Sequence, residues 1–267
     1  MLTRVPPPPS FPSRYGRWAV IAGASEGLGA AFAGALASRG LHLVLLARRA
    51  ELLEALAATL RTSHRVEVRP VACDLADPSF AAGLARATAD VDVGVAVYNA
   101  AYSYVASLFE RPLSDALRVV DVNVRAPLVF LHALVPPMIA RGRGAVVLMS
   151  SLAGFQGSPK LAAYAASKAF NTILGESLWA ELAPKGVDVI TSCAGAIRTP
   201  AYAKALRREA PGTLDASEVA ERTLAALGHG PVVIPGATNK LASQVLRRLL
   251  SRKGTIGIMG KSVSGLE

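Results

Sequence analysis

A tyrosine and a lysine stand four residues apart in the segment 163–169, at Tyr164 and Lys168. In a helix this spacing puts both side chains on one face. A phenol with an unperturbed pKa of ~10 is a poor acid or base at neutral pH, but an adjacent ammonium favours its anion. The pair can therefore work as a general acid/base, although an exposed surface pair has the same spacing.

Two polar residues upstream extend this constellation. Ser151 ends a predicted strand 13 residues before Tyr164, and Asn123 lies 28 residues before Ser151. A side chain at the carboxyl end of a buried parallel strand projects into the crevice where ligands bind in open α/β sheets. We therefore take Asn123, Ser151, Tyr164 and Lys168 as the candidate catalytic residues.

Three glycines lie where an apolar stretch gives way to an alanine-rich helical pattern, in residues 22–29. Gly23 and Gly27 let the backbone approach a pyrophosphate closely, while the helix that starts near Gly27 offers unpaired N–H groups. Gly29 allows tight packing of the helix on the strand. The turn predicts a dinucleotide site that also includes Ser25 and Leu28.

The end of the second predicted strand indicates which dinucleotide binds. Where a carboxylate normally accepts the ribose hydroxyls, the chain has Ala47, followed by Arg48 and Arg49. A guanidinium can fork onto a 2′-phosphate, although two arginines at the start of a helix also serve simply as solvated charges. Because the carboxylate is missing, we predict NADP(H) rather than NAD(H).

The next two strand ends supply further candidates for cofactor contact. Asp74 and Leu75 follow the third strand where the adenine is expected, and Asn99 and Ala100 follow the fourth. An aspartate in this position is also common as a helix cap or turn residue.

Strand-like apolar runs alternate with helical patterns along the whole chain. The runs occupy residues 19–22, 43–47, 66–72, 93–97, 145–150, 187–193 and 232–235. Continuously apolar strands joined by helical crossovers indicate an α/β fold with a doubly wound parallel sheet of about seven strands. We expect one catalytic domain over 16–236, a disordered proline-rich arm over 1–15, and a basic amphipathic helix with a tail over 237–267.

Composition narrows the classes of partner. Lys and Arg total 29 against 19 Asp and Glu, a net charge of +10, but these cations are not clustered with aromatic residues. An acidic cofactor or substrate, or a merely basic surface, explains the charge better than nucleic acid does. Two cysteines and four histidines without metal-ligand spacing indicate a cytoplasmic protein without a metal site. No signal peptide or uninterrupted membrane-spanning stretch is expected.

The glycine turn and the four polar residues together resemble the short-chain dehydrogenase/reductase family, over nearly all of residues 17–236. The resemblance implies a Rossmann-type fold and proton transfer by Tyr164 at a carbonyl or alcohol oxygen, which Ser151 would hydrogen-bond. It further implies that Lys168 holds the nicotinamide ribose and lowers the pKa of Tyr164, that Asn123 holds a relay water, and that Ile197 and Thr199 meet the carboxamide. Homodimers or homotetramers formed through residues 113–140 and 164–182 would also follow.

Three positions depart from the family pattern. After the fourth strand the chain reads Tyr98-Asn99-Ala100-Ala101, so a strand-locking side chain and a glycine are replaced. After the sixth strand it reads Ala194-Gly195 in place of Pro-Gly, and Ala22 stands where threonine is frequent. We expect the first change to affect the loop path near the nicotinamide, the second to leave the cofactor orientation intact, and the third to have a modest effect on stability.

The substrate would be a small-molecule carbonyl or alcohol. Specificity should lie in the loops 102–108, 155–160 and 200–214, where Tyr102, Phe155 and Tyr202 are tentative pocket residues. Aromatic side chains in such loops predict a lipophilic ketone or secondary alcohol, unless they are ordinary core residues. A non-catalytic NADP(H)-sensing scaffold, or a double-bond reductase or epimerase, remains an alternative on the same fold.

Near the end of the chain, Leu241, Val245 and Leu249 form an apolar stripe at helical spacing, with basic residues around it. Such a stripe packs more often against its own domain or a subunit. A peripheral contact with an acidic membrane surface is the alternative.

Overall fold

The computed structural model describes residues 10–200, 202 and 209–263. Seven strands form one sheet in the order β3-β2-β1-β4-β5-β6-β9, and every neighbouring pair is parallel. The strands are β1 (Trp18–Ala22), β2 (His42–Ala47), β3 (Val68–Ala72), β4 (Val93–Tyr98), β5 (Gly144–Ser151), β6 (Val187–Ala194) and β9 (Val232–Val233). The strand order reverses between β1 and β4, which confirms the predicted doubly wound sheet.

Burial along the strands follows their position in the sheet. Every residue of β1 and β4 is buried, as expected for central strands that are covered on both faces. The edge strand β3 is partly exposed and contains Pro70, whose missing N–H is tolerated at an edge.

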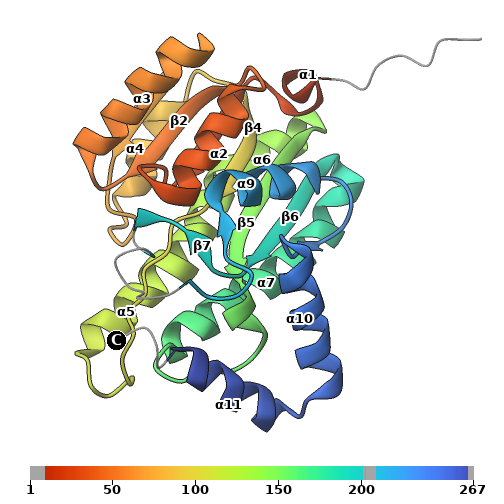
Figure 1. The fold of residues 1–267 in the computed structure, drawn as a ribbon. Helices are drawn as coiled ribbons and strands as arrows, with labels where there is room; N and C mark the ends of the chain where they lie inside the picture. The colour runs from red at the N-terminus through yellow and green to blue at the C-terminus, as the bar shows by residue number, and fades with distance from the viewer. Residues whose placement is uncertain (1–9, 201, 203–208, 264–267) are drawn as a thin grey trace, which may run out of the picture.

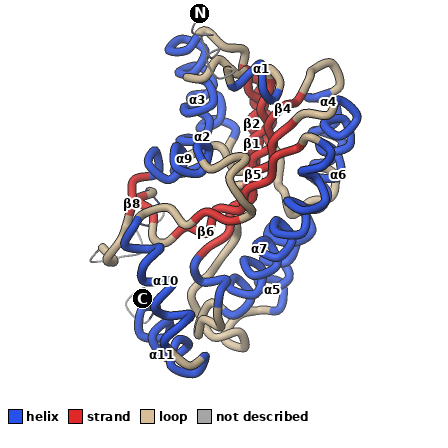
Figure 2. Tube along the Cα trace, turned by 90° about the vertical axis from the view of Figure 1, so that its right-hand side faces the viewer, coloured by secondary structure: helices blue, strands red, loops and turns tan. Residues whose placement is uncertain are grey.

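Helices cover both faces of the sheet (Figures 1 and 2). One face packs against α2 (Gly27–Ala37), α3 (Ala50–His64) and α9 (Ala216–Ala225), in a core that includes Phe32, Leu53 and Leu224. The other packs against α4 (Phe80–Thr88), α6 (Ala126–Arg141) and α7 (Ala162–Leu182), through residues such as Phe80, Phe130 and Leu182. The catalytic candidates thus come from a rigid three-layer framework.

Short irregular elements lie at the edge of the sheet that carries the site. A π-helical turn, η1 (Asp121–Arg125), joins α5 (Leu113–Val120) to α6, and the 3₁₀ turn η2 (Leu152–Phe155) follows β5. Another 3₁₀ turn, η3 (Ala183–Lys185), follows α7 at the opposite edge of the sheet, where β6 begins. The two-residue strands β7 (Ile197–Arg198) and β8 (Leu214–Asp215) pair in parallel beside the main sheet, which the sequence did not predict.

One helical stretch in the described residues, Leu113–Arg141, is long and apolar enough to cross a membrane by length and composition. Half of its most apolar window is buried within the fold. It connects β4 to β5 and packs on the sheet through Phe130, Leu134 and Met138. This packing accounts for its apolar character.

The expected disordered arm over 1–15 is wrong for its last residues. Phe11–Tyr15 form a short helix, α1, with Ser10 as its N-cap. The Tyr15 ring is buried, and the Asp188 carboxylate accepts hydrogen bonds from Tyr15 and Arg14, each at 2.8 Å. A buried aromatic anchor and an ion pair therefore hold this segment; the rest of the expected arm, residues 1–9, lies outside the described residues.

The C-terminal region contains two helices rather than the expected one. They are α10 (Ala237–Leu249) and α11 (Arg252–Val263), at the edge of the molecule beyond β6 (Figure 1). Residues 254–263 have little hydrophobic periodicity, which is why the second helix was not predicted.

Candidate active site

The glycine turn between β1 and α2 is shaped by contacts that a side chain would prevent. Gly23 has a φ of +81°, and a Cβ there would lie 2.7 Å from the Ala100 Cα. A Cβ on Gly29 would collide with the Gly23 carbonyl oxygen. The helix therefore begins close against the strand ends, with its first N–H groups facing outward, as a dinucleotide cradle requires.

Neighbouring strands hold this turn in place. The N–H groups of Gly23 and Ala24 both donate to the Leu46 carbonyl of β2, at 2.8 and 3.1 Å. From β4, the Asn99 Nδ2 donates to the Gly23 carbonyl at 2.9 Å. Asn99 thus positions the glycine turn, in addition to lining the space beside it.

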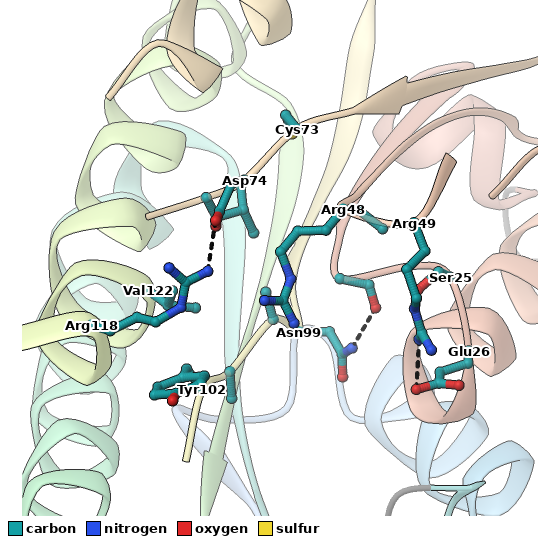
Figure 3. A pocket seen from close by; sticks show the side chains of 15 residues that line it. Ser25, Glu26, Arg48, Arg49, Cys73, Asp74, Asn99, Tyr102, Arg118 and Val122 are labelled. Carbon is teal, nitrogen blue, oxygen red and sulfur yellow. Dashed lines mark hydrogen bonds and ion pairs between the residues drawn. The ribbon is translucent and has the colours of Figure 1, made fainter. Parts of the chain in front are cut away.

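A cleft of about 220 Å³ lies at this edge of the sheet (Figure 3). It brings together most of the predicted nucleotide residues, namely Gly23, Ser25, Arg48, Arg49, Asp74, Leu75, Asn99 and Ala100. The sequence did not single out four other lining residues, Glu26, Cys73, Arg118 and Val122. Arg118 could not have been found from strand ends, because it reaches the cleft from α5.

The two adjacent arginines have different environments. Arg48 points into the cleft and forms no ion pair with any described residue (Figure 3). Arg49 pairs with the Glu26 carboxylate at 2.6 Å and donates to the Ser25 hydroxyl at 3.2 Å. Arg48 is therefore the guanidinium available to a ligand phosphate, whereas Arg49 is held beside the glycine turn.

Asp74 occupies the expected position beside the adenine space but is engaged by the protein. Its carboxylate accepts hydrogen bonds from the Ala76 N–H at 3.0 Å and from Arg118 at 2.6 Å. Burial acts to raise the pKa of Asp74, but these bonds and the nearby Arg48 charge outweigh it, so the pKa lies below its ordinary value. The carboxylate thus stays ionised and can accept hydrogen bonds from a base.

The chemical end of the site combines the end of β5 with the first turns of α7. The Ser151 hydroxyl lies beside the Tyr164 phenol, and its oxygen accepts a hydrogen bond from the Ala153 N–H at 3.2 Å. Although part of Tyr164 reaches the surface, burial raises the pKa of its phenol, and the Ser151 hydrogen bond opposes this shift. The structure therefore favours the protonated phenol.

Lys168 lies one helical turn further on, with its Nζ 5.5 Å from the centre of the Tyr164 ring. Its Nζ donates to the Met149 carbonyl at 2.9 Å, and burial lowers its pKa to about 8. Burial is the largest influence on the pKa of both groups, and the expectation that Lys168 lowers the pKa of Tyr164 stays a prediction. The predicted pair does share one helix face.

Asn123 lies in the π-helical turn η1 and is fully buried. Its Oδ1 accepts from the Tyr102 N–H at 2.8 Å, and its Nδ2 donates to the Tyr102 carbonyl at 3.0 Å and to the Ser167 hydroxyl at 2.9 Å. Asn171 Nδ2 donates to the Asn123 carbonyl at 3.1 Å. The side chain therefore holds the loop after β4; the relay water remains a prediction.

A buried polar network behind the site escaped sequence reasoning. The Ser150 hydroxyl donates to the Lys168 carbonyl at 2.7 Å and is 2.8 Å from the Thr172 hydroxyl. These contacts fix α7 against β5, so that Ser150 supports the helix while the adjacent Ser151 contacts Tyr164. Spacing alone cannot distinguish two neighbouring serines at a strand end.

The departures around the fourth strand have structural compensations. The buried Tyr98 hydroxyl donates to the Val122 carbonyl at 2.6 Å, which connects β4 to η1. Tyr98 thus also fixes the end of β4, although with a different side chain from the one that the family pattern has at this position. Only Arg65 and Lys160 have positive φ among described non-glycine residues, so Ala101 follows a path that an L-residue adopts without strain.

The residues expected near the carboxamide lie beside the glycine turn. A Cβ on Gly27 would lie 3.0 Å from the Thr199 methyl group, and the Thr199 hydroxyl accepts from the Tyr202 N–H at 3.1 Å. Ile197 is partly buried in β7. Where Ala194-Gly195 departs from the family pattern, Gly195 packs closely under Asn239 of α10.

The tentative substrate residues do not form one group. Tyr102 lies in the wall of the nucleotide cleft, with the Arg118 guanidinium 5.4 Å from its ring centre. The Tyr202 hydroxyl accepts from the Ala210 N–H at 3.0 Å, while Arg247 of α10 lies 4.6 Å from the Phe155 ring centre. The loops containing Tyr102 and Phe155 do meet, because the Ala106 N–H donates to the Lys160 carbonyl.

These features fit a nicotinamide dinucleotide. A side chain at position 23 or 29 would fill the space that the glycine turn leaves open. Beside the turn, the Arg48 guanidinium, which has no ion-pair partner among the described residues, faces the cleft. Tyr164, Ser151 and Lys168 stand along the same sheet edge, from β5 and α7. The arrangement can bind a diphosphate and transfer a proton to or from an oxygen atom.

Comparisons with known proteins agree with this geometry. The family model for short chain dehydrogenases matches residues 17–210. Inactive hydroxysteroid dehydrogenase-like protein 1 from Rattus norvegicus is 35% identical over 184 residues, which cover 68% of this chain and 56% of that protein. The chain therefore spans little more than half the length of this relative.

Two solved structures extend the match in three dimensions. One, from work on 7β-hydroxysteroid dehydrogenase stereoselectivity, has a TM-score of 0.90 and 30% identity, covering 94% of this chain and 99% of that chain. A short-chain dehydrogenase from Sphingobium yanoikuyae in complex with NADPH has a TM-score of 0.78 and 29% identity, covering 90% and 95%. Family match, fold and site agree: the chain belongs to the short-chain dehydrogenase/reductase family of oxidoreductases, which use a nicotinamide cofactor.

Proposed function

We propose that this protein is an NADP(H)-dependent oxidoreductase that interconverts a carbonyl and a secondary alcohol on a lipophilic substrate, with Tyr164 as the general acid/base. One observation carries the proposal: the Tyr164 phenol lies beside the Ser151 hydroxyl and on the same helix face as Lys168, whose Nζ is 5.5 Å from the ring centre. A bound nicotinamide supplies or accepts the hydride.

The protein's own residues manage the proton. Because burial raises the pKa of Tyr164, the phenol carries its proton at neutral pH and can donate it to a carbonyl oxygen. Ser151 donates a hydrogen bond to the same oxygen, which stabilises the negative charge that develops there. Lys168 binds the ribose hydroxyls and adds positive charge beside the phenol. This arrangement favours the reducing direction.

The choice of NADP(H) rests on Arg48. Its guanidinium enters the cleft without a carboxylate partner among the described residues, and Ala47 leaves no acid to accept ribose hydroxyls. A 2′-phosphate would provide the missing anion, through charge-assisted hydrogen bonds. The NADPH bound to the Sphingobium yanoikuyae neighbour supports the same choice.

The lipophilic character of the substrate rests on the relatives and on the aromatic loop residues. Two of the three relatives named above are, by name, a hydroxysteroid dehydrogenase and a protein similar to one. Phe155 stands in the loop after β5, four residues from Ser151. We retain Phe155 and Tyr202 as pocket candidates, while Tyr102 serves the nucleotide cleft.

We also propose a homodimer or homotetramer that forms through α5, α6 and α7. These helices carry exposed apolar side chains, including Leu113, Leu117 and Ile173, at 71%, 53% and 62% exposure. Apolar patches of this kind mark association surfaces. Light scattering after size exclusion measures the oligomeric state, and a monomer at all concentrations would contradict the proposal.

A non-catalytic NADP(H)-binding protein is the second candidate, because a relative at 35% identity is named inactive. The experiment that separates the two follows NADPH oxidation against a graded series of aliphatic, aromatic and steroid ketones. Turnover that increases with the apolar size of the ketone supports the proposed enzyme. Tight NADPH binding without turnover on any ketone supports the second candidate.

A further inference from the structure

The last long helix, α10, presents its apolar stripe to solvent. Leu241, Val245 and Leu249 are spaced four residues apart and are 64%, 42% and 75% exposed. The stripe therefore does not pack on its own domain, whereas the other expected partners, a subunit or a membrane surface, stay predictions. Something outside the chain must cover the stripe if its burial is to contribute free energy.

Polar contacts fix this orientation of the helix. Asn239 and Ser243 are the buried residues of α10. The Asn239 Nδ2 donates to the Gly212 carbonyl at 2.9 Å and to the Pro235 carbonyl at 3.2 Å, while its side chain lies over Gly195. The first bond ties α10 to the segment before β8 and the second to the turn between β9 and α10, so rotation of the helix that buried the leucines would break them.

Positive charge surrounds the stripe. Residues 237–266 contain Lys240, Arg247, Arg248, Arg252, Lys253 and Lys261, and no acidic residue. Six cations are more than half of the net charge of +10. Lys240, Arg247 and Arg248 line a groove of about 450 Å³ between α10 and the edge strand β9. Ser243 also lines this groove, and its buried hydroxyl has no hydrogen-bond partner among the described residues.

From these observations we infer that α10 docks on the surface of an anionic lipid membrane, with the apolar stripe of Leu241, Val245 and Leu249 at the acyl-chain boundary and the basic side chains of this helix on lipid phosphates. Exposed leucines next to a cluster of Lys and Arg are the combination that binds such surfaces. A second copy of this chain fits less well. A symmetric interface through α10 would bring Lys240, Arg247 and Arg248 of one copy close to the same cations of the other.

The docked helix would lie next to the substrate loop. Arg247 contacts Phe155, and a Cβ on Gly157 would lie 3.5 Å from Ile256 of α11. Under the proposed function, a lipophilic substrate dissolved in the membrane would thus meet the loop after β5 directly. Docking of α10 on a membrane does not require catalysis. A chain that does not bind vesicles can therefore still be the proposed enzyme, and a chain without activity can still bind vesicles.

The test is co-sedimentation of the full chain with vesicles of phosphatidylcholine alone or mixed with phosphatidylserine. We expect binding to the mixed vesicles, weakened by salt. In the double variant Leu241→Ser/Leu249→Ser, loss of apolar contact should lower vesicle affinity at least about tenfold. In Lys240→Gln/Arg248→Gln, we expect about a fivefold loss for each cation.

The controls change matching residues elsewhere on the surface. Leu52→Ser removes an exposed leucine of α3, and Arg86→Gln/Lys185→Gln removes two exposed cations. Both should bind vesicles like the parent chain. No binding of the parent chain to mixed vesicles, or equal binding by the leucine variant, would overturn the inference. So would a leucine variant that changes only the oligomeric state, which would identify a second copy as the partner.

Discussion

The Asn123 side chain forms two hydrogen bonds with the backbone of Tyr102, accepting from its N–H at 2.8 Å and donating to its carbonyl at 3.0 Å. The two residues belong to different elements, the π-helical turn before α6 and the loop that follows β4. This loop continues the strand whose end holds the glycine turn through Asn99. Asn123 is therefore a positioning residue for the wall of the nucleotide cleft.

Replacing Asn123 with alanine should weaken NADPH binding about tenfold and destabilise the fold. The change leaves the Tyr102 N–H and carbonyl without partners, at roughly 1–3 kcal/mol for each buried group. NADPH fluorescence titration and urea unfolding measure the two effects. Ser167→Ala is the matched control, since it removes one hydrogen-bond partner of Asn123 and keeps the two bonds between Asn123 and Tyr102. An Asn123→Ala protein with parental NADPH affinity would refute the positioning role.

Lys168→Met should abolish turnover and yet raise thermal stability at neutral pH. The pKa of Lys168 falls from 10.5 to about 8 in the folded chain. The unfolded chain therefore binds more protons between these values, and the free energy of unfolding rises with pH across this window. Below pH ~8 the buried charge costs the fold roughly 3 kcal/mol, which methionine removes, minus about 1 kcal/mol for the lost bond to Met149.

Calorimetry from pH 7 to 10.5 tests this sign. We expect the variant to melt several degrees above the parent at pH 7, with the difference shrinking as the pH rises. Lys185→Met, at an exposed lysine, should show no such pH dependence. A Lys168→Met protein less stable than the parent at pH 7 would show that burial of the ammonium carries no net cost.

Cofactor preference should shift in opposite directions when Arg48 and Glu26 are changed. Arg48→Ala should weaken NADPH roughly 10- to 100-fold and leave NADH nearly unchanged, because only NADPH offers the 2′-phosphate. Glu26→Gln should strengthen NADPH a few-fold by releasing Arg49 from its ion pair. Arg86→Ala, an exposed arginine on α4, serves as the charge control. Equal losses for both cofactors in Arg48→Ala would contradict the NADP(H) proposal.

The buried Tyr98 hydroxyl should contribute to stability rather than to chemistry. Tyr98→Phe removes its hydrogen bond to the Val122 carbonyl and should cost about 1–2 kcal/mol in urea unfolding. Amide exchange should speed up in η1, where the bond ends. Parental stability in this variant would mean that the departure at the fourth strand has no compensation.

Much of the site could be predicted because its residues sit at strand ends and at fixed helical spacing. Gly23, Asn99, Ser151 and the Tyr164–Lys168 pair follow from where apolar runs stop and from which residues share a helix face. The fold imposes these positions through parallel strands whose carboxyl ends meet at one edge. At these positions the local sequence pattern is enough to predict which residues meet in the folded protein.

The rest depends on contacts between distant residues. Arg118 forms an ion pair with Asp74, 44 positions away in the sequence, and Glu26 forms one with Arg49, 23 positions away. A pattern of strands indicates neither ion pair. The α10 stripe is a case in which a local pattern was misleading. Its spacing predicts a face that packs on the domain, but Asn239 donates to the Gly212 carbonyl, and in this orientation of the helix the leucines face solvent. Satisfying buried backbone groups outweighed the burial of an apolar face.

The central claim, proton transfer by Tyr164, is tested most directly by single-turnover NADPH oxidation in the parent chain and in Tyr164→Phe, with a ketone that the parent reduces. Phenylalanine keeps the ring over Lys168 and removes only the hydroxyl that Ser151 contacts. We expect unchanged NADPH affinity and a rate reduced by a factor on the order of 100 to 10,000. A Tyr164→Phe protein that oxidises NADPH at the parental rate would contradict it.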